Sequence, residues 1–238
     1  DLGPVGPRLG SGSIPVHAAD DALARAVGDR RQRPVAEGER LAAGDAQLPA
    51  ASAATVAAVQ TNASKAQSDG LKAQREIEKL IKLAELGDTN AMVQLAWKYK
   101  NGEGVEKSDE IAVKWYQKAA EKGDSSAQDN LGVMYRDGIG MPKMPMEAAK
   151  WFEMSAKQGN AQGQGNLGHL YLSGTGVKQD LVMAYAWSAI AVKSGNSGFA
   201  KGNMEQVKKL LKPEQLSKAE TMAAQWKPGQ PMDGAAKQ

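Results

Sequence analysis

Apolar residues between residues 88 and 196 are spaced as on one face of an α-helix. Ala91, Leu95 and Tyr99 lie four residues apart, so a helix places all three in a single stripe. The stripe returns 36 residues later, and again after a further 36, at Ala127, Leu131, Tyr135, Leu167 and Tyr171. A helix of this kind is therefore predicted three times, at a fixed period.

A second amphipathic stripe follows each of these segments with the same period. Ala112, Trp115 and Ala119 occupy positions i, i+3 and i+7. Their equivalents are Ala148, Trp151 and Ser155, and then Ala184, Trp187 and Ala191. We expect the tryptophans to pack on the following unit and the lysines beside them to face solvent. Each period therefore predicts one helix–turn–helix unit.

Glycines mark the ends of the predicted helices. A Gly followed by Asp or Asn recurs every 36 residues, at Gly87, Gly123, Gly159 and Gly195. Gly adopts the left-handed conformation that ends a helix, and the Asx side chain caps the next one. Gly-x-Gly turns then join the two helices of each unit. The predicted first helices cover about 88–100, 124–136 and 160–172, and the second helices about 108–122, 144–158 and 180–194.

The array has atypical units at both ends. Residues 71–86 fit a second helix whose first helix is missing, which predicts an N-terminal cap. After Asn196 the repeat fades, and residues 197–211 and 213–226 predict two closing helices. Terminal units depart from the consensus because they face water on one side. The predicted fold is all-α, with three clear 36-residue repeats and helical caps at both ends.

The repeat resembles a known family. "DEIAVKWYQKAAEKGD" (Asp109–Asp124) and "MEAAKWFEMSAKQGN" (Met146–Asn160) each precede a segment close to A-x-x-x-L-G-x-x-Y-x-x-G-x-G. This pattern resembles SEL-one-like repeats, relatives of tetratricopeptide repeats, over residues 71–227. Ala96 stands where the family usually has Gly, and Gly163 where it usually has Ala. The resemblance implies a right-handed α-solenoid whose usual role is protein–protein interaction.

Composition separates the N-terminal segment from the rest of the chain. Residues 1–64 carry six Arg and no Lys, whereas residues 65–238 carry 22 Lys and two Arg. The segment has no Met or aromatic residue with which to anchor a core. We expect residues 1–64 to be a disordered tail, either of foreign origin or a native leader. We expect residues 65–228 to form the solenoid and residues 229–238 a flexible C-terminal tail.

Charge and cysteine content exclude several classes of protein. The formal net charge is only +3 and the lysines are scattered, so we expect no nucleic-acid partner. The absence of Cys excludes disulfides and thiolate metal sites. No apolar run approaches the ~20 residues of a membrane-spanning helix. Charged residues precede the small residues of Leu48–Thr55, so no intact signal peptide is visible, and we expect a bacterial cytoplasmic or periplasmic location.

No combination of residues indicates an enzyme. The stretch Gly163–Gly168 satisfies G-x-G-x-x-G, but it falls inside a predicted helix and does not follow a strand. His17 lies in the tail, and His169 aligns with Trp97 and Val133, as suits a variable position on a helix. We therefore expect no catalytic residues, no cofactor and no metal.

Helix positions that the repeat does not use for packing, caps or turns are the predicted partner-binding positions. A solenoid exposes a concave face lined by its first helices. We expect that face to bind another protein or a peptide through these side chains: Gln94, Trp97, Asn130, Met134, Asn166 and His169. Amide groups can bond an extended peptide backbone, and Trp97 offers an apolar anchor. Two alternatives stay open, namely that the amides serve neighbouring turns and that Trp97 packs on the N-terminal cap.

These features predict a non-enzymatic interaction module, such as an adaptor, a regulator or an immunity-like protein. The alternative is an enzyme, or a repeat protein that binds a cell-wall component or another small ligand, since some repeats of the resembling family have been linked to such ligands. The sequence lacks residues specific for that alternative.

Overall fold

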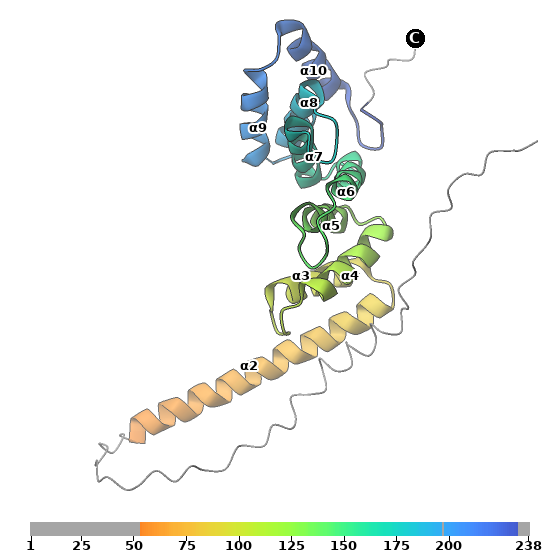
Figure 1. Cartoon of the computed structure of the whole chain (residues 1–238). Helices are drawn as coiled ribbons and strands as arrows, with labels where there is room; N and C mark the ends of the chain where they lie inside the picture. The colour runs from red at the N-terminus through yellow and green to blue at the C-terminus, as the bar shows by residue number, and fades with distance from the viewer. Residues whose placement is uncertain (1–52, 197, 233–238) are drawn as a thin grey trace, which may run out of the picture. The chain divides into compact units, whose positions relative to one another are not determined.

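The structure is a computed structural model of the 238-residue chain. It describes the backbone of residues 53–196 and 198–232, and the side chains of these ranges from residue 68 onward. The described part is all-helical, as predicted (Figure 1). Its helices are α2 (Ala53–Glu85), α3 (Thr89–Asn101), α4 (Asp109–Glu121), α5 (Ser125–Asp137), α6 (Pro145–Lys157), α7 (Ala161–Ser173), α8 (Leu181–Lys193), α9 (Phe199–Lys208) and α10 (Pro213–Gln225).

The helix ends lie where the sequence places them, because capping groups act locally. The carboxylates of Asp88 and Asp124 accept the backbone N–H groups of Ala91 and Ala127, at 2.9 and 2.7 Å. Ser108 and Asp180 cap α4 and α8 in the same way. The glycines between units have positive φ, from 90° at Gly159 to 105° at Gly195 among the four. The predicted helix boundaries of the three repeats are therefore confirmed to within about two residues.

Each helix packs on the next along the chain, from α3 through α9, and α10 packs on α8. The stripe residues fill the interfaces, so that Leu95, Leu131 and Leu167 are 1% exposed or less. The order of helix pairs and their consecutive packing form an all-α solenoid.

The tryptophans of the three repeats are not equally buried. Trp115 and Trp187 are buried, but Trp151 is only partly buried. In the middle repeat the neighbouring Phe152 is fully buried instead and joins the core cluster of α6, α7 and α8. The main buried ring of that repeat is therefore one residue later than predicted.

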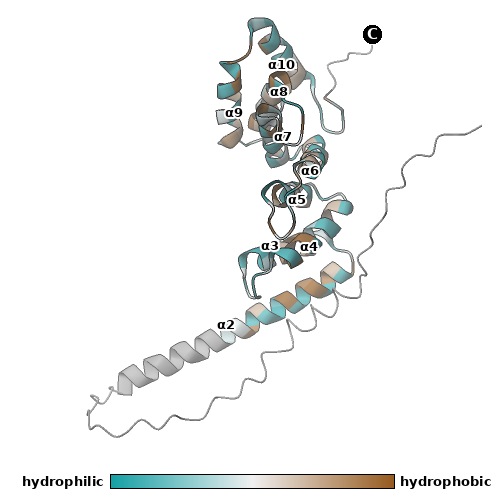
Figure 2. Cartoon of the chain, in the orientation of Figure 1, coloured by the Kyte–Doolittle hydropathy of each residue, from teal (hydrophilic) through white to brown (hydrophobic). Residues whose placement is uncertain are grey.

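The N-terminal cap is the C-terminal part of α2, as predicted from residues 71–86. A Cβ placed on Gly104 would lie 3.4 Å from the Cβ of Ala73, and Gly140 approaches the start of α4 in the equivalent way. Ile77 and Ala84 of α2 are buried, and Figure 2 shows hydrophobic and hydrophilic residues alternating there. The helix itself begins earlier, at Ala53. Most of the tail predicted for residues 1–64, including His17, lies outside the described residues. That this tail is separate from the solenoid stays a prediction.

The C-terminal boundary at residue 228 was placed too early. The indole of Trp226 meets that of Trp187 edge-on, with ring centroids 5.4 Å apart. The backbone N–H of Gly229 donates to the carbonyl of Lys157 at 2.7 Å, and Met232 is buried in the cluster with Phe152 and Trp187. Residues 229–232 thus cover α6 and α8. Residues 233–238 of the predicted flexible tail lie outside the described part.

Small residues in the first helices match large or polar partners on the facing helices. A Cβ on Gly132 would lie 2.7 Å from the ring of Phe152, so the two helices approach closely in this register. A Cβ on Gly163 would lie 2.7 Å from the Cβ of Ser155, whose hydroxyl donates to the carbonyl of Ser125 at 2.7 Å. In the preceding repeat the equivalent pair is Ala119 and Ala127. Gly163 therefore makes room for the Ser155 side chain.

Gly163→Ala alone should destabilise the protein by about 1–3 kcal/mol, because the added methyl overpacks the α6–α7 contact. Ser155→Ala in the same chain should recover most of this loss, since it restores the Ala–Ala pair of the preceding repeat. Urea unfolding, followed by circular dichroism, measures the free energy of unfolding of the wild type, the two single variants and the double variant. Additive effects of the two substitutions would show that the residues are not coupled.

Candidate functional site

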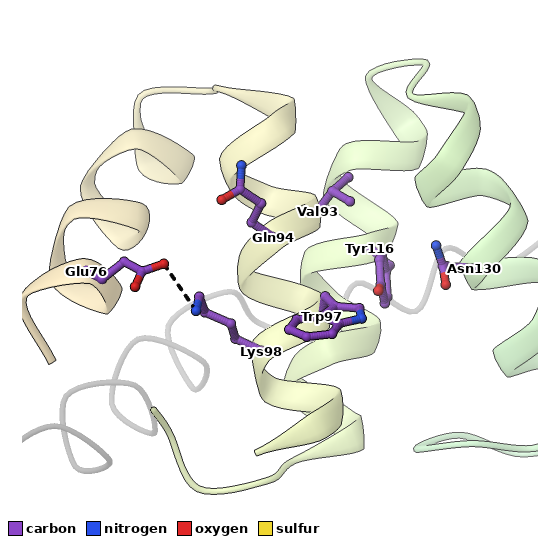
Figure 3. A pocket seen from close by; sticks show the side chains of 7 residues that line it. All are labelled: Glu76, Val93, Gln94, Trp97, Lys98, Tyr116 and Asn130. Atoms are coloured by element: carbon purple, nitrogen blue, oxygen red, sulfur yellow. Dashed lines mark ion pairs between the residues drawn. The ribbon is translucent and has the colours of Figure 1, made fainter. Parts of the chain in front are cut away.

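An open pocket of about 350 Å³ lies at the first repeat. Figure 3 shows its lining, which comes from α2, α3, α4 and α5. The lining residues are Glu76, Val93, Gln94, Trp97, Lys98, Tyr116 and Asn130. Three of the six predicted partner-binding residues, Gln94, Trp97 and Asn130, therefore lie around one hollow.

Trp97 provides the largest apolar surface of this pocket. Its side chain is 47% exposed, although it extends from a helix whose neighbouring residues Leu95 and Ala96 are fully buried. The repeat does not require an aromatic ring here, since the equivalent positions hold Val133 and His169. About half of the Trp97 surface is therefore open to solvent.

The polar groups of the pocket carry little net charge. The amino group of Lys98 lies 3.2 Å from a carboxylate oxygen of Glu76, which joins α3 to the cap helix (Figure 3). Burial raises the pKa of Tyr116 to about 12, so its phenol stays neutral at physiological pH. The pocket therefore presents an indole and the ion pair of Lys98 with Glu76, beside the buried ring of Tyr116.

Two amides line the pocket and are held by local hydrogen bonds. The Nε2 of exposed Gln94 donates to the Oδ1 of Asn90 at 3.2 Å. The Nδ2 of half-buried Asn130 donates to the carbonyl of Ser126 at 2.9 Å, one turn earlier on the same helix. An amide has two donor hydrogens and an acceptor oxygen, so each group retains hydrogen-bonding capacity for a ligand.

Asn166, the third amide of this register, ties two repeats together. Its Nδ2 donates to Asp129 at 2.8 Å, and its Oδ1 accepts from Arg136 at 3.2 Å. Burial raises the pKa of Asp129, although the hydrogen bond from Asn166 and the charge of Arg136 oppose the shift. This side chain therefore joins α7 to α5 and bonds residues within a helix, not a neighbouring turn.

Met134 and His169 lie apart from the pocket. Met134 is fully buried, so its assignment to an open binding face was wrong. It comes one residue after half-buried Val133, and one residue turns a helical side chain by about 100°. The ring of His169 packs on Phe199, with centroids 5.3 Å apart, and its Nδ1 is buried without a hydrogen-bond partner. The six predicted residues therefore do not form one surface.

The predicted partner-binding set lacks four residues of the pocket lining, namely Glu76, Val93, Lys98 and Tyr116. Glu76 comes from the cap helix, for which the repeat offers no equivalent unit. Tyr116 lies beside Trp115 on α4, at the position where the next repeat has Phe152. The aromatic residues at 116 and 152, one repeat apart, could have predicted a buried ring at this position.

The described residues contain no group of three or more His, Cys, Asp or Glu side chains that could hold a metal ion. In the same part of the chain, no helix is long and apolar enough to cross a membrane. The arrangement around Trp97 is suited to recognising an apolar side chain and neighbouring peptide groups.

Comparisons with known proteins agree with this repeat architecture. A family model described as the Sel1 repeat matches residues 89–124, 125–160 and 161–196. No curated protein matches the chain significantly. A solved Sel1 repeat protein from Oxalobacter formigenes is 36% identical over 56% of this chain and 98% of its own, with a TM-score of 0.51.

A second solved structure is c5321, described as a protective antigen of uropathogenic Escherichia coli strains with an SLR fold. It is 31% identical over 63% of this chain and 40% of its own, with a TM-score of 0.49. The periodic glycines and helix caps fit the repeat that the family model matches three times. Because the chain also covers almost the whole of the Oxalobacter formigenes protein, it belongs to the Sel1 repeat family.

Proposed function

We propose that this protein is a non-enzymatic interaction module that binds an extended segment of another protein in the Trp97 pocket. Sel1 repeat proteins generally mediate protein–protein interactions and typically act as scaffolds without catalytic activity. The observation that carries the proposal is the half-exposed indole of Trp97 in an open pocket between helices. An adaptor or regulator role fits a module of this kind.

The remaining surface of Trp97 is large enough to anchor a partner. A Trp side chain buries about 150–250 Å² when fully covered, and 47% of it is still exposed. At ~25 cal/mol per Å², covering that part contributes about 2–3 kcal/mol before ordering costs. Trp is also among the residues most enriched at binding hot spots.

The amides beside Trp97 suit the backbone of the same segment. Gln94 and Asn130 lie on adjacent first helices, α3 and α5, and both face the pocket (Figure 3). Side-chain amides can donate to a peptide carbonyl and accept from a peptide N–H. We infer that an apolar side chain of the partner contacts the indole while its backbone bonds the amides.

Site-specific photo-crosslinking identifies the partner and tests the site together. A benzophenone side chain at position 94, in cells of the source organism, should give a discrete adduct with one protein. The same group at exposed Lys114 on α4 is the matched control and should not give that adduct. Adducts of equal yield at both positions would contradict the proposal.

Trp97→Ala should then weaken binding of the crosslinked partner by about 30-fold, equivalent to about 2 kcal/mol. Isothermal titration calorimetry measures this loss, and circular dichroism should be unchanged because half of the indole already faces solvent. Leu210→Ala, which removes an exposed apolar side chain elsewhere, should leave the affinity unchanged. Wild-type affinity in Trp97→Ala would place the interaction on another face.

A further inference from the structure

The second repeat exposes methionine side chains in a way that the rest of the described chain does not. Among the described residues, the methionines classed as exposed are Met144, Met146 and Met154, at 45%, 70% and 45%. Met141, which is partly buried, precedes them in the stretch "MPKMPM". Three thioethers therefore fall within six residues where the turn meets α6.

The other repeats show that the fold does not require these methionines. Met141 stands where the neighbouring repeats have Val105 and Val177. Met146 stands where they have Glu110 and Val182. The same alignment places Met144 at the N-cap position, where the neighbouring repeats use a Ser and an Asp.

The methionine at the N-cap position is unfavourable for helix α6. Ser108 and Asp180 accept backbone N–H groups at 3.3 and 3.0 Å, whereas Met144 makes no side-chain cap. Its φ of −136° is near the −148° of Ser108, and its ψ is 81° against 108°. Positions where a sequence breaks a local rule without structural benefit are often functional.

The distinctive chemistry of methionine is that of a soft sulfur ligand. Leu would give the same apolar surface, but only the thioether coordinates metals, and it selects Cu(I). We propose that Met141, Met144 and Met146 form a three-thioether binding site for Cu(I) at the N-terminus of α6. This site goes beyond the proposed partner binding and does not depend on the Trp97 pocket.

The charged side chains next to the three methionines are largely balanced by partners. Pro145 begins α6 and fixes the backbone between Met144 and Met146, while the long, flexible side chains can turn toward one point. The neighbouring carboxylate of Glu147 already binds Lys150 at 2.6 Å. Lys143 lies close enough to Asp137 to contribute to lowering its pKa, after the hydrogen bond and charge of Arg136, so its own charge is partly balanced.

Competition with a chromogenic Cu(I) chelator under ascorbate and argon tests the site in the full chain. The wild type should remove one equivalent of Cu(I) from the chelator. Met144→Leu combined with Met146→Leu should weaken binding by at least about tenfold, since even the loss of supporting groups around a metal costs 10–100-fold. The matched control, Met154→Leu, removes an equally exposed thioether of α6 and should bind as the wild type does.

The pH dependence separates this site from histidine sites. Thioethers carry no proton, so affinity should be the same above and below about pH 6.5, where a His ligand would become protonated. In Met144→Asp, a loss of Cu(I) binding could not be explained by misfolding. It restores the N-cap of α6 and should raise Tm by about 2–4 °C, while Cu(I) affinity falls by at least about tenfold.

Methyl NMR of ¹³C-methyl methionine completes the test. Cu(I) should shift the methyl signals of Met141, Met144 and Met146 and leave that of Met154 in place. Three results would each overturn the proposal: no Cu(I) uptake by the wild type, equal losses in Met154→Leu and the double variant, or affinity that falls in acid.

Discussion

Replacing Phe152 with Ala should lower the free energy of unfolding by about 3–5 kcal/mol. The ring is fully buried and packs with Leu167, Leu170 and Trp187, so its removal leaves a cavity between the second and third repeats. The facing residue Gly132 has no side chain with which to fill that cavity. In a solenoid the loss also weakens the coupling between neighbouring repeats. Guanidinium unfolding measures the change.

Trp151→Ala is the matched control for Phe152→Ala. The indole is the larger ring, but it is only partly buried, so its removal should cost roughly half as much or less. The sequence pattern alone predicts that Trp151→Ala is the more destabilising of the two, since Trp151 lies 36 residues from both Trp115 and Trp187. A larger loss for Trp151→Ala would show that the packing between these repeats is assigned to the wrong ring.

Gly140→Ala should destabilise the protein by about 2–5 kcal/mol, combining left-handed strain with a backbone collision. The residue has φ +67°, and a Cβ there would lie 2.6 Å from the carbonyl carbon and oxygen of Asp109. Because the obstacle is backbone, no rotamer change relieves it. The turn would have to move away from the start of α4. Thermal unfolding by calorimetry measures the change.

Gly123→Ala separates the two causes. This glycine has φ +95° but no atom within 4 Å of a notional Cβ, so only the conformational strain of about 1–2 kcal/mol applies. Gly140→Ala should therefore be clearly the worse substitution. Equal losses would mean that the contact between the turn and α4 contributes nothing to stability.

The sequence by itself determines the unit, its period and the ends of its helices. These features depend on interactions within a few residues: Asp88 and Asp124 cap the helices that follow them, and the positive-φ glycines end the helices before them. The Leu stripe was predictable for the same reason, since a helix of fixed pitch puts residues four apart on one side. The repeat gives position 97 no constant role, which marked Trp97 as unusual, but the sequence left open whether its indole packs on the N-terminal cap.

Only the tertiary structure decided which neighbours those helices meet. Phe152 rather than Trp151 fills the core because Gly132 on the facing helix leaves space for its ring. Met134 is buried on a helix that packs against both α4 and α6, and Asn166 is bonded to Asp129 and Arg136 because α7 also contacts α5. These contacts join residues about 20–40 positions apart. Side-chain volume and hydrogen-bond partners across such an interface depend on how two helices approach, and a periodic pattern specifies only which side of each helix faces the other.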